Sequence, residues 1–506
     1  MKRFLTLALC MLLCLTAGLA SLSGCKKDGT PNGTGGQEVT RKPNSDSADA
    51  LPEHDFGGRT FYIYNSINEV NSFRTSNVYI EGSEDNQDSV SQYVIGRNSY
   101  VEENMNAQFR YINVAENYAN VTQYYRQVIM NAEPMDLFIN KLYPLVNLSL
   151  EGYLANVANN NYFDFYSDYW YTDYMNELSL DGNTGYILAG DYFIDVIRSV
   201  NVLAYNMDLM EEVNNETGGH SGFVNTVKDG QWTIEKMIEL SNAAYVDNGN
   251  GEYDDDDRYG YVSSQIWGAS IPIITGFNLN FISVEDGTAT VTLNNERSGK
   301  ALDSLKALFL GSGTPGYTIN LSDNSAGVNL KNKEFDDVFQ AGNALFAGGY
   351  RFANMASLVD MEAKWGVVIY PKLDETQAKY ISATHDTTEV GAIPRGCSDK
   401  DSVLQLLEYM GLLTNRSVMR EYYDKLLKLR YSREPIVAEM VDLIHDNLGG
   451  SFVVGYNNAF GDYFMWEPFY QALIKDRTFS AYYPSYSSQL EAKGDNVMRN
   501  WQKYLE

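Results

Sequence analysis

The chain has 506 residues, a formal net charge of −28 and a sequence pI of about 4.5. This acidic balance argues against nucleic acid as a partner, because phosphate binding depends on clustered lysine and arginine. The length exceeds what one ordinary hydrophobic core supports, so we expect two or three domains.

The chain begins with the anatomy of an export signal. Two basic residues after the first methionine lead into a leucine- and alanine-rich run over 4–22, which ends in Leu22-Ser23-Gly24-Cys25. This ending resembles the lipobox of bacterial lipoproteins, which implies cleavage before Cys25 and lipidation of that residue. An ordinary signal peptide or an uncleaved anchor, with Cys25 incidental, is the alternative interpretation.

Removal of this signal changes the thiol content and the charge of the chain. Of the four cysteines, two leave with residues 1–24 and Cys25 is lipidated, so Cys397 has no partner for an intrachain disulfide. Loss of the two basic residues takes the net charge from −28 to −30. A mature chain with this negative charge should not adhere to anionic lipid, so we expect membrane attachment to depend on Cys25 alone.

Residues 25–56 are rich in Gly, Asn, Ser, Thr and Pro, which predicts a flexible tether. The patterns that follow predict, in order, a strand over 59–64, a helix over 89–105, a strand over 108–114, a helix over 121–129 and a strand over 135–139. This alternation predicts a parallel sheet flanked by helices. In such sheets ligands bind beyond the carboxyl ends of the strands, where Tyr64, Asn65 and Asn140 fall.

The next elements continue a mixed α/β pattern. Strands are predicted over 185–192 and 200–205, and the second leads into a helix that starts near Asn206. Another helix starts at Thr233, whose side chain is a candidate N-cap. A later helix begins at 398–401, and about the last hundred residues have mostly helical patterns.

Signatures of several enzyme classes are absent from the sequence. There is no Gly-x-Ser-x-Gly elbow, no His-Glu-x-x-His and no phosphate-binding Gly-x-x-x-x-Gly-Lys-Ser/Thr loop, and the chain has only four histidines. A glycosidase needs only a pair of carboxylates about 5–10 Å apart, and the sequence does not exclude such a pair among its many acidic residues.

One acidic loop resembles a calcium-binding loop. In that alignment Asn248, Asn250 and Asp257 take the third, fifth and twelfth positions, and Gly251 takes the sixth. Val246 falls at the first position and has no side-chain oxygen. A solvated turn is the alternative interpretation.

Several short blocks, taken in order, resemble the family 1 extracellular solute-binding proteins, the lipoprotein receptors of ABC sugar importers. The blocks are AEPMDL at 132–137, LEGYLANV at 150–157, LAYNMDL at 203–209, QWTIEKM at 231–237, ALFAGGY at 344–350, WGVVIYPK at 365–372 and AIP at 392–394. Two blocks depart from the family pattern, with Met135 after the proline and Met207 in place of the usual lysine. The resemblance covers about 57–415.

This resemblance implies a periplasmic-binding-protein type II fold, in which two α/β lobes are joined by a hinge that the chain crosses about three times. Ligand is held in the cleft between the lobes. We expect crossings near 186–191, 344–351 and 392–397. The predicted division is a signal peptide at 1–24, a tether at 25–56, a first lobe at 57–188 with a return segment at 346–394, and a second lobe at 189–345 and 395–506, whose last part is mostly helical.

Sugars are gripped by aromatic faces and by planar polar side chains. The candidate ligand-binding residues are Tyr64, Asn65, Asn140, Asp191, Tyr192, Trp267, Arg351, His385 and Asp386. Asp191 and Asp386 would accept hydroxyl protons, and Arg351 would donate hydrogen bonds from a fixed fork. Core packing of the aromatic residues and a lobe-stabilising ion pair of Arg351 are the alternatives. The 38 tyrosines carry the same ambiguity, between sugar stacking and ordinary packing.

Together these features predict a lipid-anchored extracellular substrate-binding protein, not an enzyme. It would capture a sugar, in particular an oligosaccharide, by lobe closure and deliver it to the permease subunits of an ABC importer. We expect a monomer on the extracytoplasmic face of the cell membrane, without a cofactor other than the calcium considered above. A peptide or another polar solute is an alternative ligand. A surface glycan-binding or sensory lipoprotein without transport, or an extracellular glycosidase, is an alternative function.

Overall fold

A computed structural model describes most of the chain after residue 53. The described residues are 54–67, 77–84, 89–115, 118–252, 254, 256–263, 266–285, 288–310, 334–430, 434–461 and 466–504. The first unit of the chain, Met1–Glu53, lies outside them, and with it the predicted signal, Cys25 and nearly all of the predicted tether. None of the helices in the described part is long and apolar enough to cross a bilayer.

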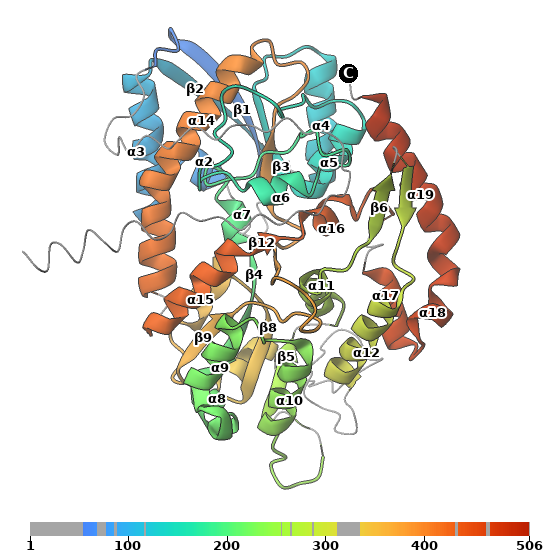
Figure 1. The fold of residues 1–506 in the computed structure, drawn as a ribbon. Helices are drawn as coiled ribbons and strands as arrows, with labels where there is room; N and C mark the ends of the chain where they lie inside the picture. Colours follow the sequence, from blue (N-terminus) through green and yellow to red (C-terminus); the bar gives the residue numbers. More distant parts are fainter. Residues whose placement is uncertain are drawn as a thin grey trace, which may run out of the picture. The chain divides into compact units, whose positions relative to one another are not determined.

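The first sheet has the strand order β11-β3-β1-β2. Figure 1 labels β1, β2 and β3 of this sheet. Strands β1 (Arg59–Ile67), β2 (Ala107–Ala115) and β3 (Leu137–Lys141) are parallel. Helix α3 (Ser89–Asn104) lies between β1 and β2 in the sequence, and α4 (Tyr118–Met130) lies between β2 and β3, so the predicted alternation is confirmed. The fourth strand, β11 (Glu389–Ala392), comes from a distant part of the chain and pairs antiparallel with β3.

The burial pattern explains why these segments form layers. All five residues of β3 are buried, as expected for a strand with both faces covered. Helix α3 places Val90 and Val94 in the core, one helical turn apart. On α4, the Tyr125 hydroxyl lies 2.9 Å from the carbonyl oxygen of Tyr64 and 2.6 Å from that of Ile139. This hydroxyl therefore ties α4 to both β1 and β3.

The second sheet has the order β5-β8-β4-β9. Its strands are β4 (Asn201–Asn206), β5 (Tyr259–Ser263), β8 (Ala344–Arg351) and β9 (Trp365–Val368). Strand β4 is antiparallel to β8 and β9, and β5 is parallel to β8. Three helices follow β4 in the chain and pack beside this sheet: α8 (Met207–Val213), α9 (Gly219–Lys228) and α10 (Ile234–Ala244) (Figure 1).

The start of α10 anchors these helices to the second sheet. Thr233 accepts a hydrogen bond from the backbone N–H of Lys236, which confirms the predicted cap. Trp232, just before it, is fully buried, packs against Phe223 and Phe346, and donates from Nε1 to a backbone carbonyl at 2.9 Å.

The other helices and strands are distributed along the rest of the chain. The remaining helices are α2 (Asn77–Ile80), α5 (Leu142–Leu150), α6 (Thr172–Asn176), α7 (Asp195–Arg198), η2 (Asn215–Thr217), α11 (Ile266–Gly276), α12 (Glu296–Leu310), α13 (Phe335–Gln340), η3 (Phe352–Leu358), α14 (Lys400–Arg416), η4 (Arg420–Arg430), α15 (Pro435–Asp446), α16 (Ser451–Tyr456), α17 (Glu467–Ile474), α18 (Phe479–Tyr482) and α19 (Pro484–Lys503). Two small strand pairs are β6 (Ile282–Glu285) with β7 (Thr288–Val291), and β10 (Ser382–Ala383) with β12 (Leu448–Gly449).

The strand pairing differs from the predicted lobe boundaries. The prediction places 346–394 in the first lobe, but β8 and β9 pair within the second sheet and only β11 rejoins the first. The C-terminal helices also divide between the two sheets, since α14 packs on α3 and α16 on α5, whereas α15 packs on β9. Short apolar strands such as β8 fit either sheet equally well, so their patterns do not reveal which one they join.

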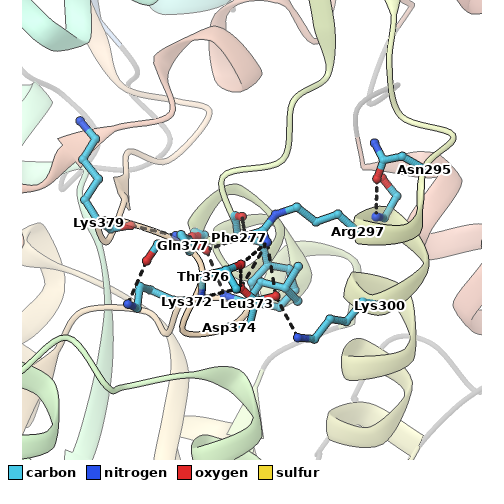
Figure 2. A network of polar contacts seen from close by, with 12 residues as sticks. Phe277, Asn295, Arg297, Lys300, Lys372, Leu373, Asp374, Thr376, Gln377 and Lys379 are labelled. Carbon is cyan, nitrogen blue, oxygen red and sulfur yellow. Dashed lines mark hydrogen bonds and ion pairs between the residues drawn. The ribbon is translucent and has the colours of Figure 1, made fainter. Parts of the chain in front are cut away.

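A polar network holds the turn after β9 against α11 and α12 (Figure 2). The buried side chain of Gln377 uses both ends of its amide. Its Oε1 accepts from the Leu373 N–H at 3.0 Å and from Arg297 at 3.3 Å, and its Nε2 donates to the carbonyls of Gly276 at 2.8 Å and Lys379 at 2.9 Å. Beside it, the Asp374 carboxylate pairs with Arg297 and with a lysine on α12.

Replacing Gln377 by alanine should lower the free energy of unfolding by about 1–3 kcal/mol, because it leaves buried backbone groups without partners. The urea-unfolding midpoint measures this loss. Replacing the neighbouring exposed Glu375 by alanine is the control and should change stability by less than about 0.5 kcal/mol. Equal effects of the two substitutions would contradict a structural role for the amide.

Candidate functional site

Three segments run side by side where the chain passes between elements of the two sheets. We call them the junction: residues 188–201, 382–391 and 447–451. Leu188 pairs with Gly391 and Val200 pairs with Thr384 through isolated bridges, and β10 lies parallel to β12. The predicted crossing at 186–191 meets the junction, whereas 344–351 is strand β8, and the crossing expected at 392–397 lies earlier, at 382–391.

Strand ends from both sheets bring polar side chains to this junction. In the first sheet, Lys141 at the end of β3 is in register with Glu389 at the start of β11. In the second sheet, Asn201 at the start of β4 is in register with Arg351 at the end of β8. Asn201 also donates to the carbonyl of Ala383 at 3.0 Å, so it links β4 to the second junction segment.

The junction collects buried charges of both signs. We call the following set the junction cluster: Lys141, Asp195, Arg198, Arg351, His385, Asp386 and Glu389. The cations Lys141, Arg198 and Arg351 are only 6%, 4% and 8% exposed. Burying a charge costs free energy unless the charge is paired. The concentration of charges therefore makes the junction a candidate for a functional role.

Asp195 organises one half of the cluster. It opens helix α7, and its Oδ1 accepts from Arg198 at 2.9 Å. Its Oδ2 accepts from the Ser199 hydroxyl at 3.0 Å and from the Glu389 backbone N–H at 2.9 Å. The guanidinium of Arg198 also lies over the ring of Tyr79 on α2, at 4.3 Å from its centroid. Asp195 thus links the first junction segment to β11.

Glu389 is a fully buried carboxyl group beside Asp195. Its Oε1 accepts from the hydroxyl of Ser66, at the end of β1, at 2.9 Å. Burial and the neighbouring charge of Asp195 raise the pKa of Glu389, against the opposing effects of Ser66, Lys141 and Arg198. The carboxyl therefore favours its protonated form at a higher pH than an exposed glutamate does.

The other half of the cluster lies around Asp386. His385 contacts Asp386 at 2.6 Å, and Arg351 donates to the Thr387 hydroxyl at 3.5 Å. Burial alone would raise the pKa of Asp386, but His385, Lys141 and Arg351 together lower it. Asp386 therefore favours its ionised form near the cations Lys141 and Arg351. Cations, carboxylates and hydroxyls held this way can donate to and accept from a polyhydroxylated ligand.

Three of the predicted ligand-binding residues are thus brought together: Arg351, His385 and Asp386. Three others are buried inside the first sheet: Tyr64 and Asn65 within β1, and Asn140 near the end of β3. Tyr64 donates to the carbonyl of Pro134 at 3.0 Å, Asn65 donates to Asn113 at 3.1 Å, and Asn140 accepts from the backbone N–H of the next residue at 2.8 Å. These side chains stabilise the sheet and its strand ends.

The remaining three predicted residues lie elsewhere. Asp191 is buried and accepts from Tyr171 at 2.6 Å and from Asn415 at 2.8 Å, which ties the first junction segment to α14. Tyr192 is buried beneath the guanidinium of Arg97, 4.8 Å from its ring centroid. Trp267 is in α11, and its side chain lies outside the part that the structure describes.

Sequence reasoning missed four members of the junction cluster: Lys141, Asp195, Arg198 and Glu389. Lys141 is the last residue of β3 and Glu389 is the first residue of β11. A charged residue is unexpected in such a buried strand unless it has a partner. Asp195 and Arg198 are spaced as an i,i+3 pair. These positions could have been noticed in the sequence. That the four side chains come together, however, depends on long-range strand pairing.

The loop predicted to bind calcium is closed by its own hydrogen bonds. Asn248 accepts from the Asn250 N–H at 3.0 Å, and Asn250 accepts from the Glu252 N–H at 2.7 Å. The Asp257 carboxylate accepts from the Asn248 N–H at 2.9 Å and from Tyr245 at 3.0 Å. Across the described residues, no group of three or more His, Cys, Asp and Glu side chains is placed to hold a metal ion. Calcium at this loop stays a prediction.

Comparison with known proteins shows which fold the chain has. No family model and no curated protein matches the chain. The galacto-N-biose-/lacto-N-biose I-binding protein of the ABC transporter from Bifidobacterium longum, solved with lacto-N-biose, matches with a TM-score of 0.52 and 13% identity over 88% of this chain and 99% of its own. A cyclo/maltodextrin-binding protein complexed with maltotetraose matches with a TM-score of 0.52 and 11% identity over 91% of this chain and 100% of its own.

The chain has the fold of the periplasmic-binding-protein type II sugar binders. The predicted fold class is therefore confirmed, as is the resemblance to the fold of family 1 solute-binding proteins. Within this solute-binding fold, the junction cluster is where both sheets contribute buried charged side chains to one place. We take it as the candidate functional site.

Proposed function

We propose that this protein is a carbohydrate-binding receptor of an ABC importer and not an enzyme. The observation that carries the proposal is the junction cluster, in which hydrogen-bonding side chains from both sheets meet where the chain passes between them. A ligand that bonded to both sheets there would stabilise one arrangement of the two over others. The bound ligands named for the two matching solved structures, lacto-N-biose and maltotetraose, support a sugar, and we propose an oligosaccharide.

The remaining parts of the proposal concern location and delivery. We propose that Cys25 carries a lipid that holds the protein on the extracytoplasmic face of the cell membrane, as a monomer on a tether. Confinement to the plane of its permease would raise the effective concentration of loaded receptor there. Metabolic labelling with a fatty-acid analogue tests the anchor, since Cys25→Ala should abolish labelling.

The direct test of ligand class is thermal-shift screening of the purified chain against monosaccharides and oligosaccharides. A bound sugar at 100 times its dissociation constant should add about 2.7 kcal/mol to the free energy of unfolding. Shifts with peptides but not with sugars would contradict the carbohydrate assignment. Hydrolysis of a glycan by the purified protein would contradict a purely binding role.

A substitution in the junction cluster tests the site. Arg351→Ala should weaken oligosaccharide binding at least tenfold, because a charge-assisted hydrogen bond contributes about 1.5–3 kcal/mol. The matched control is Arg126→Ala, which removes an arginine paired with Glu151 on the first sheet's side and should leave affinity unchanged. Titration calorimetry measures both variants. Equal affinity of the Arg351 variant and the wild type would place the ligand away from the cluster.

A further inference from the structure

A cavity lies beside the third junction segment, between α16, the end of α11 and strand β6. Its volume is about 340 Å³. It is lined by Glu177, Ser179, Leu180, Thr275, Asn278, Leu279, Asn280, Phe281, Ile282, Val284, Ile381, Gly450, Phe452 and Val453. None of these residues belongs to the junction cluster, although Gly450 lies in the third junction segment.

The polar lining of the cavity is made of acceptors and amides without a cation. Glu177 is fixed by Ser451, whose backbone N–H and hydroxyl donate to Oε2 at 2.8 and 3.2 Å. The side chains of Asn278 and Asn280 are exposed, and Ser179 adds a hydroxyl. No lysine or arginine is among the lining residues, so the cavity does not suit an anion.

The apolar lining includes two aromatic rings. Phe281 is buried beside β6, and Phe452 is half-buried on α16, where its ring stacks on Tyr456 with centroids 4.9 Å apart. Here polar and apolar side chains line the cavity together, and small-molecule sites combine a few convergent polar groups with apolar side chains in the same way. Rings next to amides and a carboxyl suit a molecule that has both C–H faces and hydroxyl groups.

The cavity wall is closely packed through two glycines of the third junction segment. A Cβ on Gly450, which has φ of +73°, would lie 2.3 Å from Cγ2 of Thr275. A Cβ on Gly449 would lie 3.0 Å from Oε1 of Glu177. The absence of side chains here lets α11 and Glu177 approach the start of α16, which forms one continuous wall.

We propose that this cavity is a second ligand site, which takes a single uncharged, hydroxyl-rich ring of monosaccharide size. The volume is near the lower end of the roughly 300–1,000 Å³ of small-molecule pockets, so an oligosaccharide would not be enclosed. Glu177 would accept hydroxyl protons, Asn280 would donate and accept, and Phe452 would face the C–H groups of the ring. This site goes beyond the proposed function, which rests on the junction cluster.

Titration calorimetry of the purified full chain with a panel of neutral monosaccharides tests the proposal. We expect one of them to bind and Glu177→Gln to weaken that binding at least fivefold, because it replaces one acceptor oxygen by an NH₂ donor. Asn280→Ala should weaken it as well. The matched control is Glu239→Gln, an exposed glutamate on α10, which should leave it unchanged.

Arg351→Ala separates this site from the junction cluster. We expect it to leave monosaccharide binding intact even where it abolishes oligosaccharide binding, so that the two proposals fail independently. Absence of binding by every monosaccharide, or binding lost in Arg351→Ala and kept in both cavity variants, would overturn the second site. Because Asn280 is exposed, we expect Asn280→Ala to fold normally. Urea unfolding of each variant checks that the variant is folded.

Discussion

Replacing Asp195 by alanine should lower the free energy of unfolding by about 3–5 kcal/mol, because breaking a buried ion pair leaves a charge without its partner. Asp195 accepts hydrogen bonds from Arg198, Ser199 and the Glu389 backbone. Arg198 would lose its carboxylate partner in a buried position, and the Glu389 N–H would lose its acceptor. The loss should therefore exceed that of any single surface pair.

The chain provides a matched control for this substitution. Lys236 and Glu239 have the same i,i+3 spacing on α10, but the Glu239 side chain is 65% exposed. Glu239→Ala should change stability by less than about 1 kcal/mol, as exposed pairs do. Urea-unfolding midpoints compare the two variants. A loss below about 1 kcal/mol for Asp195→Ala would show that the cluster does not stabilise the fold.

The second large effect is on the pH dependence of stability. The pKa of Glu389 is raised in the folded chain, mainly by burial and then by Asp195, so the folded state holds this proton more tightly than the unfolded state. The free energy of unfolding should therefore fall as pH rises from the ordinary pKa of glutamate through the raised one. Below the ordinary value the contribution is constant, because both states are protonated.

Glu389→Gln isolates this contribution. Glutamine keeps an acceptor for the Ser66 hydroxyl but carries no titrating proton, so the decline with rising pH should become shallower. Urea unfolding at a series of pH values between about 5 and 9 measures the slope for wild type and variant. Glu239→Gln, on the exposed surface, should leave the slope unchanged. Identical slopes for Glu389→Gln and wild type would rule out Glu389 as the titrating group.

Local sequence patterns were enough to predict the three parallel strands of the first sheet and the helices α3 and α4 between them. The alternation of strands and helices from Arg59 to Lys141 follows from apolar periodicity over neighbouring residues. The place of β11 could not be predicted in this way, because its four residues join β3 through pairing with a distant segment. The same limit applies to β8, whose apolar residues satisfy either sheet.

Only part of the candidate site could be predicted from the sequence, because the rest also depends on pairing between distant segments. We predicted Tyr64 and Asn65 at the carboxyl end of a strand over 59–64, but β1 continues to Ile67 and both side chains are buried within it. Arg351 and Asp386 were identified from residue type and position after a strand. Their neighbour Lys141, on β3, is brought to that segment by the antiparallel pairing of β3 with β11.

That antiparallel pairing also constrains the order in which the chain can fold. Strand β3 is made early during synthesis, yet its outer edge has no partner until Glu389–Ala392 has followed. Until then its unpaired N–H and C=O groups are a template for association with other chains. Such distant pairing slows folding. A fragment that ends before β11 should therefore aggregate, whereas a chain that includes β11 pairs this edge with its own residues.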